Sequence, residues 1–144
     1  MDPNDGTIID NQTGLMWEKK VGGAGCLHCV DDTYDWFDAM SDWISEVNGH
    51  TDDPNVQAGL GGHTDWRLPT IVELQTLLIE PFPCGTDPCI DPIFGPPFSS
   101  FYWSSTSLAG IPTDAWLVLF FDGFVLTGDK SNVIPLVRAV RGGL

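Results

Sequence analysis

The segment Trp66-Arg67-Leu68-Pro69-Thr70 constrains the fold most strongly, because it specifies a strand, a stop and a helix start in succession. Thr70 and Glu73 form a Thr-x-x-Glu capping box before an apolar run, which predicts a helix beginning after Thr70. Pro69 disfavours helical geometry at Leu68, so the helix cannot begin earlier. We therefore expect a core strand that leads directly into a capped helix.

Arg67 stands inside this apolar segment, and its charge needs a partner. An unpaired buried guanidinium is very costly, so we expect an ion pair with Asp65 or Glu73 in preference to an anion-binding role. The same reasoning applies to Arg138 and Arg141 near the end of the chain. The residues predicted to be structural are Trp66, Arg67, Thr70, Glu73, Arg138 and Arg141.

The remaining patterns predict one α+β domain over residues 1–144. Apolar residues at helical spacing predict a first helix that ends at Asn48-Gly49 and is capped by Asp31, Asp32 or Thr33. The predicted strands lie over residues 7–9, 15–17, 101–105, 115–120, 124–126 and 133–140. We expect two helices packed on antiparallel sheets, with long irregular loops over 49–65 and 80–99.

The charge balance is strongly acidic, with 6 Lys and Arg against 20 Asp and Glu, a net charge of −14. Such a surface repels phosphate backbones, anionic membranes and sulfated glycans, so nucleic acid is excluded as a partner. It suits cations and basic partners, although net charge can also serve solubility alone. The longest apolar run, 116–121, is far shorter than the ~20 residues of a membrane helix, so no membrane insertion is expected.

Four cysteines, Cys26, Cys29, Cys84 and Cys89, stand in loop-like sequence. Their even number favours disulfides and therefore a secreted, cell-surface or periplasmic location. The pairing is open: two local disulfides, two cross-links between the loops, a four-cysteine zinc site or a redox Cys-x-x-Cys. The start of the chain lacks the basic and apolar regions of a leader, so we expect a mature sequence.

The acidic loops are the candidate metal site. Asp52, Asp53, Asp87 and Asp91 could supply oxygen ligands to calcium, which takes six to eight of them. His50 and His63 flank the first loop and could add ligands there. The alternative is that these acids are solvated and bind no metal, since the sequence has no EF-hand pattern.

The face of the final sheet is the candidate ligand surface. Its predicted members are Trp103, Asp114, Trp116, Phe121 and Asp122. Aromatic side chains stack well on sugars and anchor protein partners. The alternative is that most of these aromatic residues pack in the core.

Several phrases in order along the chain carry a family resemblance. They are Thr13-Gly14-Leu15-Met16-Trp17, Asp65 to Thr70 with Glu73-Leu74, Tyr102 to Thr106, Gly123, and Val137 to Gly142. Together they resemble the bacterial family of the C-terminal domain of the Legionella collagen-like adhesin, over roughly residues 7–142. The resemblance implies a C-type-lectin-like fold, related to formylglycine-generating enzymes and phage tropism proteins, in extracellular or envelope-associated proteins. The named adhesin binds sulfated polysaccharides through a trimer.

The chain departs from this family pattern in two ways. Ala139 stands where many relatives have Cys in the closing phrase, and the acidity opposes a sulfated ligand. Related formylglycine-generating enzymes use a reactive cysteine pair late in the chain, and no cysteine follows Cys89 here. We therefore expect an extracytoplasmic adhesion or ligand-binding module that recognises a glycan or protein and is not an enzyme. The alternatives are a structural subunit of a cell-surface or filament assembly, as a trimer or polymer, and less readily an enzyme.

Overall fold

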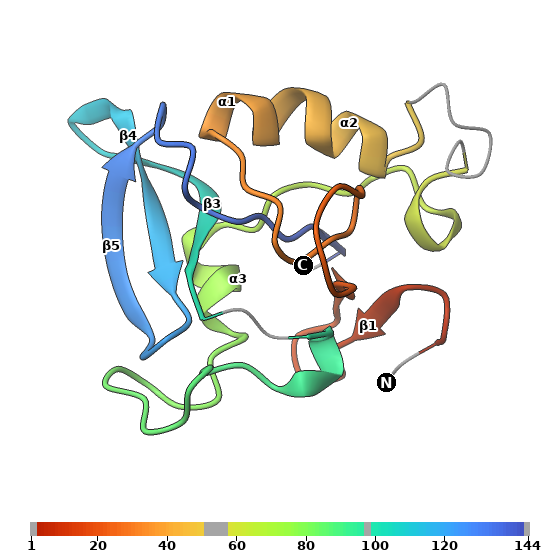
Figure 1. The fold of residues 1–144 in the computed structure, drawn as a ribbon, viewed down its shortest axis with the longest axis horizontal. Helices are drawn as coiled ribbons and strands as arrows, with labels where there is room; N and C mark the ends of the chain where they lie inside the picture. The colour runs from red at the N-terminus through yellow and green to blue at the C-terminus, as the bar shows by residue number, and fades with distance from the viewer. Residues whose placement is uncertain (1–2, 51–57, 97–98, 143–144) are drawn as a thin grey trace.

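The computed structural model describes residues 3–50, 58–96 and 99–142, and these residues form two three-stranded antiparallel sheets (Figure 1). The first sheet has the order β1-β2-β6, with β1 at Thr7–Ile9, β2 at Leu15–Glu18 and β6 at Val140–Gly142. The second sheet has the order β3-β4-β5, with β3 at Phe101–Leu108, β4 at Ile111–Leu119 and β5 at Phe124–Asp129. The predicted α+β class is confirmed, and the strands nearest the two ends of the chain share one sheet.

The first predicted helix runs from Trp36 to Val47 and contains a π-helical turn. It consists of α1 (Trp36–Asp38), the π turn (Ala39–Trp43) and α2 (Ile44–Val47). Asp35 caps it, because its Oδ1 accepts a hydrogen bond of 2.8 Å from the Asp38 amide. The predicted caps at Asp31, Asp32 or Thr33 are therefore wrong: the Asp32 carboxylate instead accepts the amides of Gly25 and Cys26.

The second helix, α3 (Ile71–Gln75), begins where the sequence predicts. The Thr70 hydroxyl accepts from the Glu73 amide, and Glu73 Oε1 accepts from the Thr70 amide, which completes the capping box. The helix ends at Gln75, and Leu78 beyond it forms a β-bridge with Ile90. Two short 3₁₀ turns complete the helical segments, at Leu60–Gly62 and Pro92–Phe94.

The predicted last strand over 133–140 is wrong over most of its length. Val133 and Ile134 are each 62% exposed, and Pro135 has no amide hydrogen for a β-ladder. Leu136 instead bonds to β3, since its amide donates to Phe101 O and its carbonyl accepts from Trp103 N. Regular pairing with β2 begins only at Val140.

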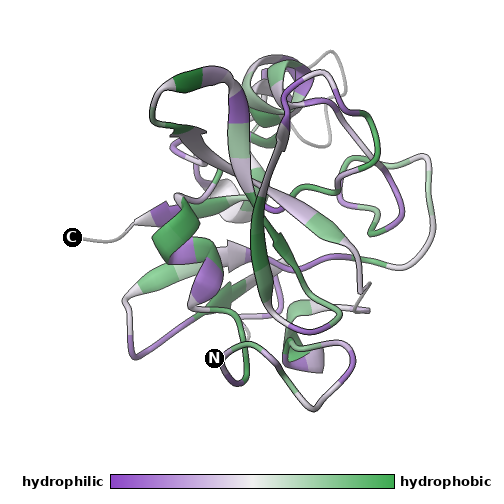
Figure 2. Cartoon of the chain, turned by 90° about the vertical axis from the view of Figure 1, so that its left-hand side faces the viewer, coloured by the Kyte–Doolittle hydropathy of each residue, from purple (hydrophilic) through white to green (hydrophobic). Residues whose placement is uncertain are grey.

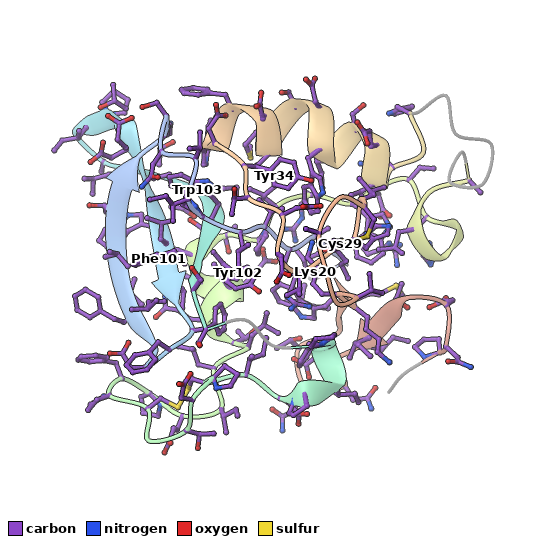
Figure 3. All side chains as sticks on the ribbon, in the orientation of Figure 1. Lys20, Cys29, Tyr34, Phe101, Tyr102 and Trp103 are labelled. Carbon is purple, nitrogen blue, oxygen red and sulfur yellow. A yellow bond between two sulfur atoms is a disulfide. The ribbon has the colours of Figure 1, made fainter. Side chains whose placement is uncertain are left out.

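Alternate residues of the second sheet enter two different cores. Val118 packs with Tyr102 in the cluster that contains Leu74 of α3. Leu117 packs with Trp103 in the cluster that contains the buried face of the Trp36–Val47 helix. Figure 3 labels Tyr102 and Trp103, the consecutive residues of β3 that enter these two cores. The sheet is therefore held from both faces, in agreement with the period-two geometry of strands.

A fully buried carboxylate joins β2 to the loop that follows it and to the segment that leads into β6. Glu18 at the end of β2 is 0% exposed, and its Oε1 lies 2.9 Å from the Nζ of Lys20. Its Oε2 lies 2.5 Å from Nδ1 of His28, and the Ala139 amide donates to Oε1 at 3.3 Å. Arg138 is also buried, and its Nη1 donates to the Glu18 carbonyl at 2.7 Å.

The Phe94 carbonyl ties a third segment to this cluster. It accepts from the Lys20 amide at 3.0 Å and from Arg138 Nη1 at 2.9 Å. Gly95 makes this close approach possible, because a Cβ at this position would lie 2.1 Å from the Lys20 carbonyl oxygen. Its φ of +106° is also a conformation that favours glycine.

The environment of Glu18 favours its ionised form. Burial by itself would raise the pKa of Glu18, but the Lys20 charge and the hydrogen bonds from His28 and Lys20 outweigh it. The pKa falls from 4.5 to about 2. A depressed carboxylate pKa stabilises the folded state fully above the unfolded value of 4.5, and this contribution is lost as the pH falls toward 2.

Replacing Glu18 by Gln is expected to lower the free energy of unfolding by about 3–5 kcal/mol, because it leaves the Lys20 ammonium buried without its counter-charge. The measurement is urea unfolding at neutral pH. The same chemical change at the exposed Glu46, Glu46→Gln, is the matched control and should change stability by less than about 0.5 kcal/mol. The difference in stability between wild type and Glu18→Gln should also shrink between pH 4.5 and 2; a constant difference would contradict the assigned pKa.

Candidate binding surface

The loop between α3 and the second sheet is attached to the β4–β5 turn. The Cys84 amide donates to Asp122 O and the Cys89 amide to Phe120 O, both at 2.7 Å. Cys84 and Cys89 also form a disulfide with each other. In Figure 1 the loop runs beneath the lower end of the β4–β5 hairpin, in agreement with these bonds.

Four apolar side chains remain exposed where loop and hairpin meet, and we call them the hairpin patch: Ile79, Phe82, Phe121 and Phe124. Their exposed fractions are 52%, 52%, 51% and 43%. The Phe82 and Phe124 rings contact each other, with centroids 5.2 Å apart. Figure 2, coloured by hydropathy, shows green segments at the lower end of this hairpin. Large side chains gathered at the surface in this way are typical of interaction sites.

Carboxylates lie beside the hairpin patch. Asp122 belongs to the turn, where its Oδ1 accepts the Phe124 amide at 3.1 Å. Glu80 lies between Ile79 and Phe82 in sequence, and its Oε1 accepts the Gly85 amide at 2.8 Å. These bonds hold both acids in place, so the patch combines apolar surface with fixed negative charge.

Only part of the predicted ligand surface lies at this patch. Phe121 belongs to the patch and Asp122 lies beside it, but Trp103 is 0% exposed and its indole donates to Tyr34 O at 2.9 Å. The prediction that Trp103 contacts a ligand is therefore wrong, because its strand position faces the helix 36–47 core. Trp116 and Asp114 are half-buried and lie toward the other end of β4, opposite Thr127 and Asp129.

Sequence reasoning missed Ile79, Phe82 and Phe124. A usable signal was present, because Phe82 stands between Pro81 and Pro83, and prolines hold an apolar residue in a loop where burial is hard to achieve. Phe124 directly follows the Asp122-Gly123 turn, where side chains tend to be exposed. Nothing in the sequence indicates that the loop and the turn meet.

The basic residues are occupied within the fold. Lys20 and Arg138 belong to the Glu18 cluster, and Lys130 is buried with its Nζ 2.7 Å from Ser107 Oγ and 4.0 Å from the Trp36 ring centroid. Arg141 pairs with Asp65, Nε to Oδ1 at 2.6 Å. Lys19 also has an interaction partner. The outer surface is therefore dominated by carboxylates.

Arg67 pairs with Glu73, which is one of the two partners predicted for it, Asp65 and Glu73. The contact is bidentate, at 2.6 and 2.7 Å, and Arg67 Nη2 also donates to Gly142 O. The hydrogen bond from Arg67 is the main reason why the pKa of Glu73 is lowered. The Arg67 side chain is 42% exposed, however, so the expectation of a buried pair is wrong. The pair joins α3 to β6 at the surface.

An open pocket of about 540 Å³ lies next to this pair and is lined by Met40, Arg67, Leu68, Thr70, Glu73 and Ser105. Its polar side chains already have partners inside the fold. Ser105 Oγ donates to Pro69 O, and Thr70 is engaged in the capping box. A ligand here would find few free hydrogen-bonding groups, so the hairpin patch is the better candidate.

The cysteines form two local disulfides, Cys26–Cys29 and Cys84–Cys89. This pairing decides between the alternatives that the sequence left open.

The predicted metal ligands do not form a site among the described residues. Asp87 is exposed, and Asp91 caps the Pro92–Phe94 turn by accepting the Ile93 amide. Asp52 and Asp53 lie outside the described residues. Within residues 3–50, 58–96 and 99–142, no group of three or more His, Cys, Asp or Glu is arranged to hold a metal ion.

No helix in the part of the chain that the structure describes is long and apolar enough to cross a membrane.

The model of the Lcl C-terminal domain family matches residues 6–141, nearly the whole chain. No curated protein matches the chain significantly. The chain therefore belongs to the Lcl C-terminal domain family, as the resemblance of its motifs indicated.

Replacing Cys84 and Cys89 together by Ser is expected to lower the free energy of unfolding by about 2 kcal/mol, the loop-closure contribution of a short disulfide loop. The replacement should also speed hydrogen exchange at the backbone amides of residues 84 and 89, which bond to the β4–β5 turn. The paired replacement of Cys26 and Cys29 by Ser is the control and should leave those two amides unchanged. Equal acceleration in both variants would show that the loop is not anchored by its own disulfide.

Proposed function

We propose that this Lcl C-terminal domain is an extracytoplasmic, non-catalytic binding module of an adhesin, and that its partner is a neutral glycan or a protein rather than a sulfated polymer. The distribution of charge is the observation that supports this most directly. The described Lys and Arg side chains are engaged within the fold, while the carboxylates dominate the surface. A polyanion would therefore meet repulsion without compensating contacts.

The two local disulfides support an extracytoplasmic location, because disulfides persist in oxidising compartments. We also infer that the fold is C-type-lectin-like. Its support is the arrangement of two helical segments with two antiparallel sheets, long irregular connections, and terminal strands that share a sheet.

The assignment as a non-catalytic module rests on the state of the reactive side chains. Ser104 and Ser105 donate their hydroxyls to the carbonyls of Trp116 and Pro69, and no histidine bond to either is present among the described residues. All four cysteines are in disulfides, so no reactive thiol of the formylglycine-generating type is available. His28 is bound to the buried Glu18.

The test is a solid-phase array with neutral glycans, sulfated glycans and extracellular proteins, probed with the labelled chain at physiological salt, with and without millimolar calcium. We expect binding to at least one neutral glycan or protein and none to heparin-type polymers. Saturable heparin binding would contradict the proposal. Light scattering on the same sample addresses the alternative role as a structural subunit, since large homopolymers would favour that role.

A further inference from the structure

We propose that the hairpin patch is a docking surface for a basic segment of another protein, one that presents Lys or Arg together with an apolar or aromatic anchor. This inference rests on the proposed binding function and names the surface and the class of partner. Three observations support the inference: the exposed rings, the rigid support beneath them and the negative charge around them.

The exposed rings supply the anchor contacts. Phe82 and Phe124 are about half exposed, and their rings contact each other in a tilted arrangement at 57° with centroids 5.2 Å apart, so they already form one continuous apolar surface. Phe121 adds a third half-exposed ring from the same turn. Buried aromatic side chains contribute most of the binding energy at protein interfaces, and ring faces also attract cations. A partner with both features would therefore use the whole patch.

The support beneath the rings is rigid. The Cys84 and Cys89 amides bond to the turn carbonyls, and the Cys84–Cys89 disulfide closes the loop. A Cβ placed on Gly123 would lie 3.6 Å from the Phe82 amide nitrogen, so loop and turn are in van der Waals contact. A surface that is already ordered loses little conformational entropy when a partner binds.

The charge around the patch has a single sign and selects the partner. No Lys or Arg occurs between Arg67 and Lys130, the stretch that contains both the loop and the hairpin. Lys130 itself is only 7% exposed. Asp122 and Glu80 lie beside the rings, and Asp87 is exposed within the disulfide loop. A basic segment is attracted to this surface, whereas a polyanion or a second copy of the acidic chain is repelled.

The experiment is an NMR titration of the isotopically labelled chain with two short synthetic peptides of equal Trp and Leu content. One peptide carries Lys and Arg at the remaining positions, and the other carries Glu there. We expect saturable chemical-shift changes at residues 79–84 and 120–125 with the basic peptide and none with the acidic one. Changes confined to the carboxylate-bearing residues Asp38, Asp42 and Glu46 of the 36–47 helix, which line one pocket together, would overturn the proposal.

Phe124→Ser should weaken binding of the basic peptide at least about tenfold, as expected for a central interface ring. Phe37→Ser is the matched control, because Phe37 is 55% exposed, stands between acids and lies on α1, away from the patch. Equal losses in both variants would overturn the assignment. Asp122→Asn keeps an oxygen for the Phe124 amide and should weaken binding and reduce its salt dependence.

The outcomes separate this inference from the proposed function. If a neutral glycan from the array shifts residues 79–84 and 120–125 and the basic peptide does not, the partner class is wrong and the binding function stands. If the chain forms stable dimers through the patch, the partner class is wrong as well, since the occupant is then a second copy. If neither array nor peptides bind, both proposals fail.

Discussion

The buried ion pair of Glu18 is the interaction on which the rest of the structure depends. Through Lys20, His28 and Ala139 the carboxylate contacts the loop that follows β2 and the segment that leads into β6. Arg138 extends the cluster to the Phe94 carbonyl and so to the turn before the second sheet. A charge at 0% exposure is tolerated only when its partners are in place, so these four segments must assemble together.

A consequence of this architecture is that the surface charge is predominantly negative. A chain with 6 basic and 20 acidic residues could still present a basic patch if its cations were exposed together. Here the cations pair with the buried Glu18, with partly exposed carboxylates, with backbone carbonyls and with ring faces, as Lys130 does between Ser107 and Trp36. The fold therefore makes the surface more acidic than composition alone requires, and this acidity is the basis of our proposal that the partner is not a sulfated polymer.

The local elements could be predicted because their signals are local. The Thr70–Glu73 capping box set the start of α3, and the strands predicted over residues 115–120 and 124–126 correspond to β4 and β5. Errors arose where a distant segment competed for a residue. Within the predicted strand 133–140, Pro135 bonds to the loop before α1 and Leu136 bonds to β3, so regular strand pairing is lost there.

The candidate site shows the same difference between features set by local sequence and features set by contacts between distant segments. The sequence by itself determined the family, the α+β class, the capped second helix, the acidity and the presence of an even set of cysteines, because each depends on composition or on neighbouring residues. Only the tertiary structure decided that Trp103 is core, that Arg67 pairs with Glu73 at the surface, and that Phe82 meets Phe124. Those outcomes depend on contacts between segments far apart in the chain, and the free energy of such contacts is set by packing and burial rather than by local preference.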